Sequence, residues 1–167
     1  MINLKRDIER LAWQESRLVF PAFNQSHAWE LGSLIRRDCE AAGAAMSIEI
    51  RLVKATVFFY AMPGTKPNNA DWIRRKRNTV ELLHRSSYAV GRSLELEGSS
   101  LQAKMGRPLR DFAVQGGGFP IFCEGVGCIG AATVSGVPER EDHAIVVRAL
   151  AALRGVPLHE VELDPAG

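Results

Sequence analysis

Alternation of apolar and polar residues predicts a β-hairpin in the first half of the chain. In residues 47–53 (SIEIRLV), three aliphatic side chains alternate with polar and charged ones, the pattern of a half-buried strand in an antiparallel sheet. Residues 54 and 55 leave room only for a tight turn before the apolar run 56–62 (TVFFYAM). We therefore expect two consecutive strands that pair with each other.

A second hairpin is predicted after three consecutive glycines at positions 116–118. Such a run favours a sharp turn, because glycine loses the most conformational entropy in a regular element. The runs 119–123 (FPIFC) and 128–134 (CIGAATV) are short, apolar and separated by a glycine-rich turn, which indicates two strands. Pro120 cannot donate a ladder hydrogen bond, so we expect it at the start of its strand or on a sheet edge.

The register of this second hairpin determines what its two cysteines can do. A turn centred between residues 125 and 126 places Cys123 opposite Cys128, with Cβ atoms about 4.5–5.5 Å apart, whereas a disulfide needs about 3.8 Å. A redox pair or half of a metal site stays open, but two buried thiols are favoured because free cysteine behaves as a small hydrophobe. The small residues 130–132 favour a closely packed helix over a flat ligand.

Helical periodicity predicts four helices, in residues 2–18, from Ser26 to Gly43, from Asp71 to about Glu95, and from Pro138 to Leu153. Weaker patterns suggest a strand at 111–114 and a short edge strand at 159–163. This element order predicts an α+β domain with about five strands in a mostly antiparallel sheet, flanked by helices.

Composition narrows the class of protein. The chain has 167 residues, 46% hydrophobic and 24% charged, which fits one domain over residues 1–167 with a core of its own. A net charge of +2 gives no argument for nucleic-acid binding. Because the sequence has no apolar run of membrane-spanning length, no signal peptide and three cysteines without a framework, we expect a cytoplasmic protein.

Polar residues interrupt the apolar stripe of the predicted helix 71–95. Lys76 and Ser87 lie on the stripe, and Arg77 and His84 lie beside it; a buried charge must be paired. The run 74–77 (RRKR) also places four cations where the helix dipole disfavours them. A solvated basic face explains this run best, and the alternative is an anion pocket facing the sheet.

The motifs GGGFPI and IGAATVSG, followed by a helix with Asp-His near its start, resemble the GlcG/HbpS family of small haem-binding or "haem-degrading" domains. The C-terminal domain of one class of corrinoid adenosyltransferase is similar. The segments DWIRRKRNTV and HRSSYAVG resemble a branch of that family without assigned activity. This resemblance implies a profilin-like three-layer fold, haem as the candidate cofactor, and homo-oligomers.

Three functions follow as hypotheses. The first is binding of haem or another small anionic molecule, with His143 as the first candidate for an iron ligand and His84 as the second. The second is an enzyme that uses His143 as general base and Lys76 or Arg77 to hold an anionic substrate, although the sequence has no nucleophile motif and no metal-binding motif. The third is an oligomer without chemistry, formed through the strand edge at 119–121. The candidate ligand contacts are Lys76, Arg77, His84, Gly117, Phe119, Asp142 and His143.

Overall fold

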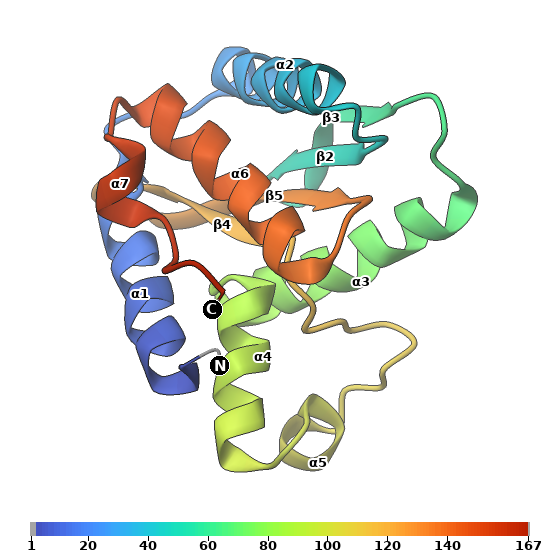
Figure 1. The fold of residues 1–167 in the computed structure, drawn as a ribbon, viewed down its shortest axis with the longest axis vertical. Helices are drawn as coiled ribbons and strands as arrows, with labels where there is room; N and C mark the ends of the chain where they lie inside the picture. The colour runs from blue at the N-terminus through green and yellow to red at the C-terminus, as the bar shows by residue number, and fades with distance from the viewer. Residues whose placement is uncertain (1–2, 167) are drawn as a thin grey trace.

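A five-stranded sheet organises the fold in the computed structural model, which describes residues 3–166. The sheet order is β1-β4-β5-β2-β3, and the last four of these strands are labelled in Figure 1. The strands are β1 (Val19–Phe20), β2 (Ser47–Leu52), β3 (Ala55–Ala61), β4 (Gly118–Cys123) and β5 (Gly127–Ser135). The helices are α1 (Leu4–Arg17), α2 (Gln25–Ala42), α3 (Pro67–Leu83), α4 (Ser87–Glu97), α5 (Leu101–Met105), α6 (Glu139–Arg154) and α7 (Leu158–Val161).

Both predicted hairpins are present, and the mostly antiparallel sheet is confirmed. β2 pairs with β3 and with β5, and β4 pairs with β5, all antiparallel. The parallel pair is β1 with β4, through Val19 and Phe20. Pro120 lies in the part of β4 that β1 does not pair, so its missing N–H costs no ladder bond on that side.

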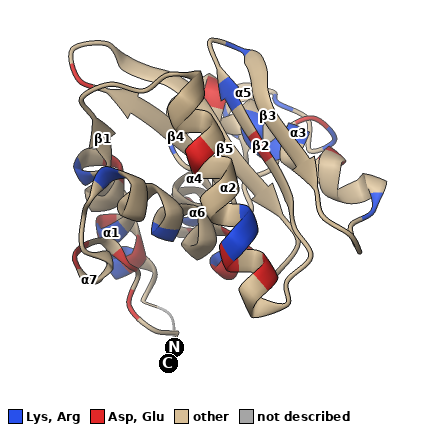
Figure 2. Ribbon diagram, turned by 90° about the horizontal axis from the view of Figure 1, so that it is seen from above, with Lys and Arg blue, Asp and Glu red and all other residues tan. Residues whose placement is uncertain are grey.

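The two faces of the sheet differ in chemistry, and this difference decides which helices cover them. On one face, Ile48, Ile50, Phe119 and Ile121 join the main apolar core with residues of α2 and α6. On the other face, β2 presents charged residues that pair with α3. Helices therefore enclose the sheet on both sides (Figure 2), which confirms the three-layer α/β/α prediction.

The prediction of one helix from 71 to 95 is wrong, because the chain breaks it at His84. α3 begins earlier, at Pro67, and ends at Leu83, and His84 takes the left-handed conformation with φ 53°. Ser86 then caps α4, because its side chain accepts a hydrogen bond from the Ala89 N–H at 3.2 Å. Ser86 is therefore better suited to a helix start than to a helix interior.

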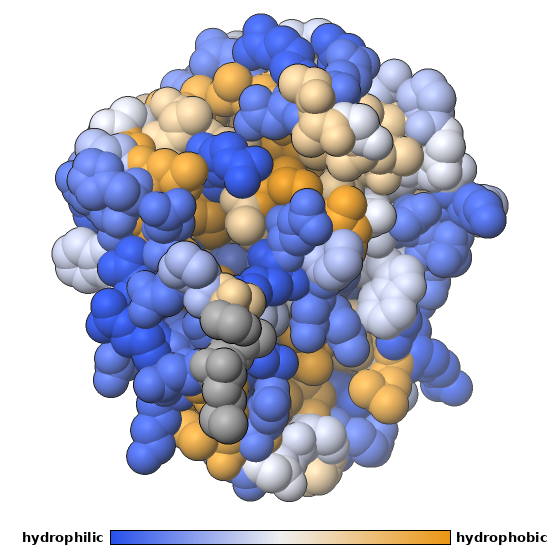
Figure 3. All heavy atoms as spheres, viewed as in Figure 1, coloured by the Kyte–Doolittle hydropathy of each residue, from blue (hydrophilic) through white to orange (hydrophobic). Residues whose placement is uncertain are grey.

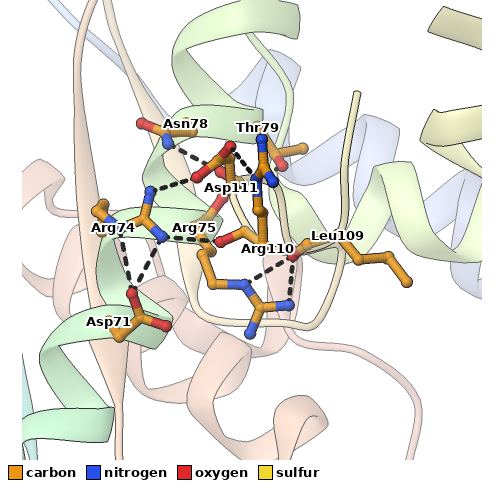
Figure 4. Close-up of polar contacts among 8 residues, drawn as sticks. All are labelled: Asp71, Arg74, Arg75, Asn78, Thr79, Leu109, Arg110 and Asp111. Carbon is orange, nitrogen blue, oxygen red and sulfur yellow. Dashed lines mark hydrogen bonds and ion pairs between the residues drawn. The ribbon is translucent and has the colours of Figure 1, made fainter. Parts of the chain in front are cut away.

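The predicted strand at 111–114 is also wrong, because this segment bonds to a helix instead of a sheet. The Asn78 side chain donates to Asp111 O at 2.8 Å, the Ala113 N–H donates to Arg75 O at 3.0 Å, and the Thr79 hydroxyl donates to Ala113 O at 2.8 Å. Figure 4 shows how α3 holds this loop through its polar face. These bonds to α3 take the place of a strand ladder.

Further predictions need correction at the edges of the fold. The fifth strand is β1, which is too short to show an alternating pattern, and residues 158–161 form α7 instead of an edge strand. In the second hairpin, a bulge after Ile121 pairs Phe122 with Cys128 and Cys123 with Gly127, so the two cysteines are not opposite each other. Both are free thiols, but they are only partly buried, so the expectation of two buried thiols is wrong. α2 begins at Gln25, one residue before the predicted Ser26, and Asn24 caps it.

Candidate functional site

The three glycines at the start of β4, residues 116–118, bring α3 and the start of α6 together. Gly117 has φ +132°, and a Cβ on it would lie 2.5 Å from Val134 O and 2.8 Å from Lys76 Nζ. A Cβ on Gly116 would lie 2.1 Å from Glu139 O. Only glycine leaves room for these approaches, so the turn that the sequence predicted serves to close the helices onto the end of the sheet.

Lys76 and Asp142 form a buried ion pair beside this turn. Lys76 Nζ donates to Asp142 Oδ2 at 2.9 Å and to Val134 O at 3.0 Å, and both side chains are 3% exposed. Asp142 Oδ1 also accepts from the Val137 N–H at 3.1 Å. Burial lowers the pKa of the Lys76 amine and raises the pKa of the Asp142 carboxyl, and in each case the partner's charge opposes the shift.

His143 follows on the same helix and is completely enclosed. Its Nε2 lies 2.7 Å from Gln14 Oε1, and the Gln14 amide donates to Val161 O at 2.7 Å. Gln14 Oε1 can only accept, so Nε2 carries the proton and Nδ1 is left as a buried lone pair without a partner within the described residues. Burial, with a smaller contribution from the Arg140 charge, lowers the pKa of His143 to about 3.

A cavity of about 430 Å³ lies beside His143, between α6 and the C-terminal segment that includes α7. Figure 3 shows apolar residues exposed between α7 and α6, surrounded by hydrophilic ones. The lining combines apolar residues with both signs of charge: Gln14, Pro138, Arg140, Glu141, His143, Ala144, Val147, Arg148, Leu158, Glu162, Leu163, Asp164, Pro165 and Ala166.

Two arginines of this lining differ in what they bind. Arg140 makes a bidentate pair with the buried Asp7, at 2.6 and 3.0 Å, and also donates to Asp164 O at 2.7 Å. This pairing raises its pKa further above the ordinary arginine value. Arg148 is exposed and makes no ion pair within residues 3–166. Arg148 is therefore the cation that remains available to a ligand.

The structure brings together five of the seven residues that the sequence singled out. Lys76, Gly117 and Asp142 meet at the ion pair, and the Phe119 and His143 rings lie with centroids 6.0 Å apart. The other two residues, Arg77 and His84, lie away from this group.

Arg77 donates to both carboxylate oxygens of Glu49, at 3.0 and 3.2 Å, on the sheet face covered by α3. His84 is exposed at the end of α3. The basic run 74–77 is therefore neither one solvated face nor one anion pocket. Arg74 binds Asp71, Asp111 and Arg110 O, and Arg75 binds Leu109 O (Figure 4).

Gln14, Asp7, Arg140 and Arg148 are site residues that sequence reasoning did not select. The contact between Gln14 and His143 spans 129 residues of chain. The buried positions of Asp7 and Gln14 on α1 give one signal, since polar residues inside an apolar stripe require partners. The identity of those partners cannot be obtained from that pattern.

These features define a class: a mixed α/β domain with one open sheet, a glycine turn over a buried ion pair, and a ligand-sized cavity beside the last long helix. Residues 23–151 match the family described as "Haem degrading protein HbpS-like", and the chain belongs to this family. A "UPF0303 protein" of Azotobacter vinelandii is 50% identical over 163 residues, covering 98% of each chain.

Two solved structures share the fold. The chain is similar to the Ybr137w protein with a TM-score of 0.82 and 25% identity, covering 89% of this chain and 87% of that one. It is similar to the protein of the "PduOC:Heme Complex" with a TM-score of 0.68 and 17% identity, covering 78% and 94%. None of the helices in residues 3–166 has the length and apolar character needed to cross a membrane.

Ligation of haem iron by His143 does not fit this arrangement. An axial histidine must offer a nitrogen lone pair to the iron. Nε2 of His143 is engaged by Gln14, and Nδ1 is buried with the rest of the side chain, which is 1% exposed. His84 is exposed, but it does not line the cavity. The residues around His143 therefore do not form an iron site in this structure.

Proposed function

We propose that this protein binds a small molecule with an apolar body and an anionic group in the cavity between α6 and the C-terminal segment. The observation that carries the proposal is the cavity of about 430 Å³ beside the buried His143. Its volume falls in the range of about 300–1,000 Å³ that ligand pockets occupy, and a few polar groups in an apolar lining are typical of such pockets.

Each part of the ligand has a counterpart in the lining. Val147, Leu158 and Leu163 offer apolar contact, and Arg148 offers an unpaired guanidinium. Guanidinium groups bind carboxylates and phosphates with two parallel hydrogen bonds. Because Arg140 is already neutralised by Asp7, Arg148 is the residue that would select the anionic end.

The same geometry favours binding over general-base catalysis. A general base works best with a pKa near the operating pH, whereas burial holds the pKa of His143 at about 3. Its Nε2 also donates to Gln14 Oε1 and is not available to a substrate proton. His143 is better suited to fixing Gln14 and the cavity wall than to moving protons.

A titration with 8-anilinonaphthalene-1-sulfonate, which has an aromatic body and one sulfonate, tests the proposal through its fluorescence. We expect saturable binding to the native protein that Arg148→Ala weakens about fivefold, the equivalent of about 1 kcal/mol. Ala144→Leu should also weaken it by filling the cavity without removing a charge. Arg107→Ala, which removes an exposed arginine outside the lining, is the matched control and should leave the affinity unchanged.

Binding that is insensitive to both Arg148→Ala and Ala144→Leu would contradict this site. Haemin is the second probe, because the family to which the chain belongs is described as haem-degrading. Binding of haemin through its propionates should respond to Arg148→Ala and not to His143→Ala. A Soret shift that His143→Ala abolishes would show that the helix opens to expose the imidazole, and would replace our assignment with iron ligation.

We also infer that the chain forms homo-oligomers. The edge 119–121 that the sequence suggested cannot serve, because Phe119 and Ile121 are fully buried. The free sheet edge is β3, which has no charged residue in ATVFFYA and exposes Phe59 and Tyr60 by 48% and 37%. Exposed edges of this kind pair readily with another strand, and a second copy of β3 carries no charge that would oppose pairing.

A further inference from the structure

Lys76 differs from the other lysines in its surroundings. The chain has five lysines, all within the described residues, and the other four are exposed. Lys76 is 3% exposed, and its ammonium group spends two of its three N–H donors on Asp142 and Val134 O. The remaining donor has no partner within residues 3–166.

A second, smaller pocket lies at this lysine, separate from the cavity of the proposed function. Its volume is about 180 Å³, and most of its lining residues carry polar side chains: Asn68, Asn69, Trp72, Lys76, Gln115, Ser135, Gly136 and Glu139. At about 30 Å³ for each water, the pocket holds a molecule of on the order of six non-hydrogen atoms. The side-chain amides of Asn68 and Gln115 and the indole N–H of Trp72 offer donors to an oxygen-rich ligand.

A purely structural role explains the lysine poorly. Replacing a buried ion pair with apolar residues of similar size is often neutral or stabilising, so joining α3 to α6 did not require a charge. Gly117 lets the turn approach the amine closely, because a Cβ there would lie 2.8 Å from Lys76 Nζ and 2.5 Å from Val134 O. The backbone takes an unusual conformation at this position, φ +132°.

One proton of this ion pair can reside either on Lys76 or on Asp142. Burial lowers the pKa of Lys76 and raises that of Asp142, which moves each group toward its uncharged form, while the charge of the partner opposes both shifts. Glu139, the other acid at the pocket, accepts from the Gly116 N–H at 3.4 Å and lies 3.7 Å from Arg92. An uncharged amine is a nucleophile, whereas an ammonium ion is not.

We propose that Lys76 forms an imine with a small carbonyl compound, an aldehyde or a short 2-oxo acid, in this pocket. Lys76 first gives one proton to Asp142. The free amine attacks the carbonyl carbon, so that a C–N bond forms and the C=O π bond breaks, and the oxygen takes the proton from Asp142. The nitrogen of the carbinolamine then returns a proton to Asp142, which passes it to the hydroxyl group. Water leaves as the C–O bond breaks and the C=N bond forms, which gives a protonated imine beside the Asp142 carboxylate. No oxidant or reductant is consumed.

Trapping with sodium borohydride tests this proposal, with glyoxylate as the probe. Hydride adds to the imine carbon and fixes the adduct as a secondary amine, which mass spectrometry of chymotryptic peptides assigns to one lysine. The four exposed lysines react in the same mixture and serve as internal references. We expect Lys76 to be labelled at least tenfold faster than the other four, with a rate that saturates with glyoxylate concentration.

Two variants distinguish labelling of Lys76 in a binding pocket from labelling that reflects only the reactivity of the amine. Gln115→Ala changes an exposed residue of the pocket, should leave the fold intact, and should raise the glyoxylate concentration needed for half-saturation severalfold. Asp142→Asn keeps the lysine but removes the proton acceptor, and should slow the labelling of Lys76 at least tenfold. Its folding is checked separately by circular dichroism.

If Asp142→Asn fails to fold, Gln115→Ala and the site of labelling still decide the question. Lys76 that stays unlabelled in the native protein, yet reacts after unfolding in urea, would overturn the proposal and leave the pair as a structural contact. Labelling of Lys76 without saturation, or without response to Gln115→Ala, would overturn it as well. None of these results bears on the cavity at Arg148, whose test uses a different probe.

Discussion

The two sites show, at the scale of single residues, how burial and one partner change what a side chain can do. Asp142 and His143 are adjacent in the sequence, yet Asp142 faces Lys76 and His143 faces Gln14. The sequence indicated Lys76 and Gly117, because a charge in an apolar stripe and a glycine run are visible locally. Asp142 and His143 were indicated by the Asp-His pair near a helix start, which is part of the family resemblance. It could not indicate Gln14, because that contact depends on how α1 packs against α6.

The pH dependence of stability should reveal the enclosure of His143. Its pKa is about 3 in the folded protein and about 6.5 in the unfolded chain. Below about pH 6.5 the unfolded state therefore takes up a proton that the folded state does not, and stability falls as the pH drops from about 6.5 toward about 3. Between pH 7.5 and pH 5, urea unfolding should show a loss of about 1–2 kcal/mol from this residue.

His143→Gln provides the control, because its amide can still donate to Gln14 Oε1 but does not titrate. The variant should lose less stability than the wild type over the same pH interval. Carboxylates titrate in both proteins, so only the difference between the two slopes is informative. Equal slopes would mean that His143 can be protonated in the folded state.

At the scale of elements, the sequence predicted those with strong periodicity and missed those set by tertiary contacts. The hairpins β2–β3 and β4–β5 and the helices α1, α2 and α6 follow from pattern alone. The break between α3 and α4 does not, because apolar positions continue across it. The segment 111–114 resembled a strand, but its hydrogen bonds go to Arg75, Asn78 and Thr79 of α3.

The cap at Ser86 should account for much of the stability of this break. Its hydroxyl is fully buried and accepts from the Ala89 N–H, so Ser86→Ala should destabilise the protein by about 1–2 kcal/mol in urea unfolding. Ser100→Ala is a matched control, because Ser100 is half-buried and caps the five-residue α5 in the same way, through an exposed hydrogen bond. Ser100→Ala should lower the free energy of unfolding clearly less than Ser86→Ala does. An equal cost in both variants would show that the α3–α4 break does not depend on its cap.

At the scale of the whole molecule, helices cover both faces of the sheet but leave its edge at β3 uncovered. β1 ends the other side of the sheet after two residues, and Arg154 donates to Val19 O there at 2.7 Å. On β3 the exposed edge runs for seven residues. Trp29 of α2, which is 67% exposed and stacks edge-on against Phe58, extends the apolar surface beyond the strand.

At the scale of the whole molecule, we therefore predict that the protein self-associates through β3. Light scattering coupled to size-exclusion chromatography should find the wild type larger than one chain, and Phe59→Lys should shift it toward the monomer, because charges on edge strands oppose pairing. Leu109→Lys is the matched control: Leu109 is 66% exposed but lies on a loop that α3 holds, and its substitution should leave the mass unchanged.

A wild type that remains monomeric at high concentration would contradict the inference. An oligomer that resists Phe59→Lys but dissociates with Leu109→Lys would move the interface to the loop, and β3 would then need another explanation for its uncharged edge.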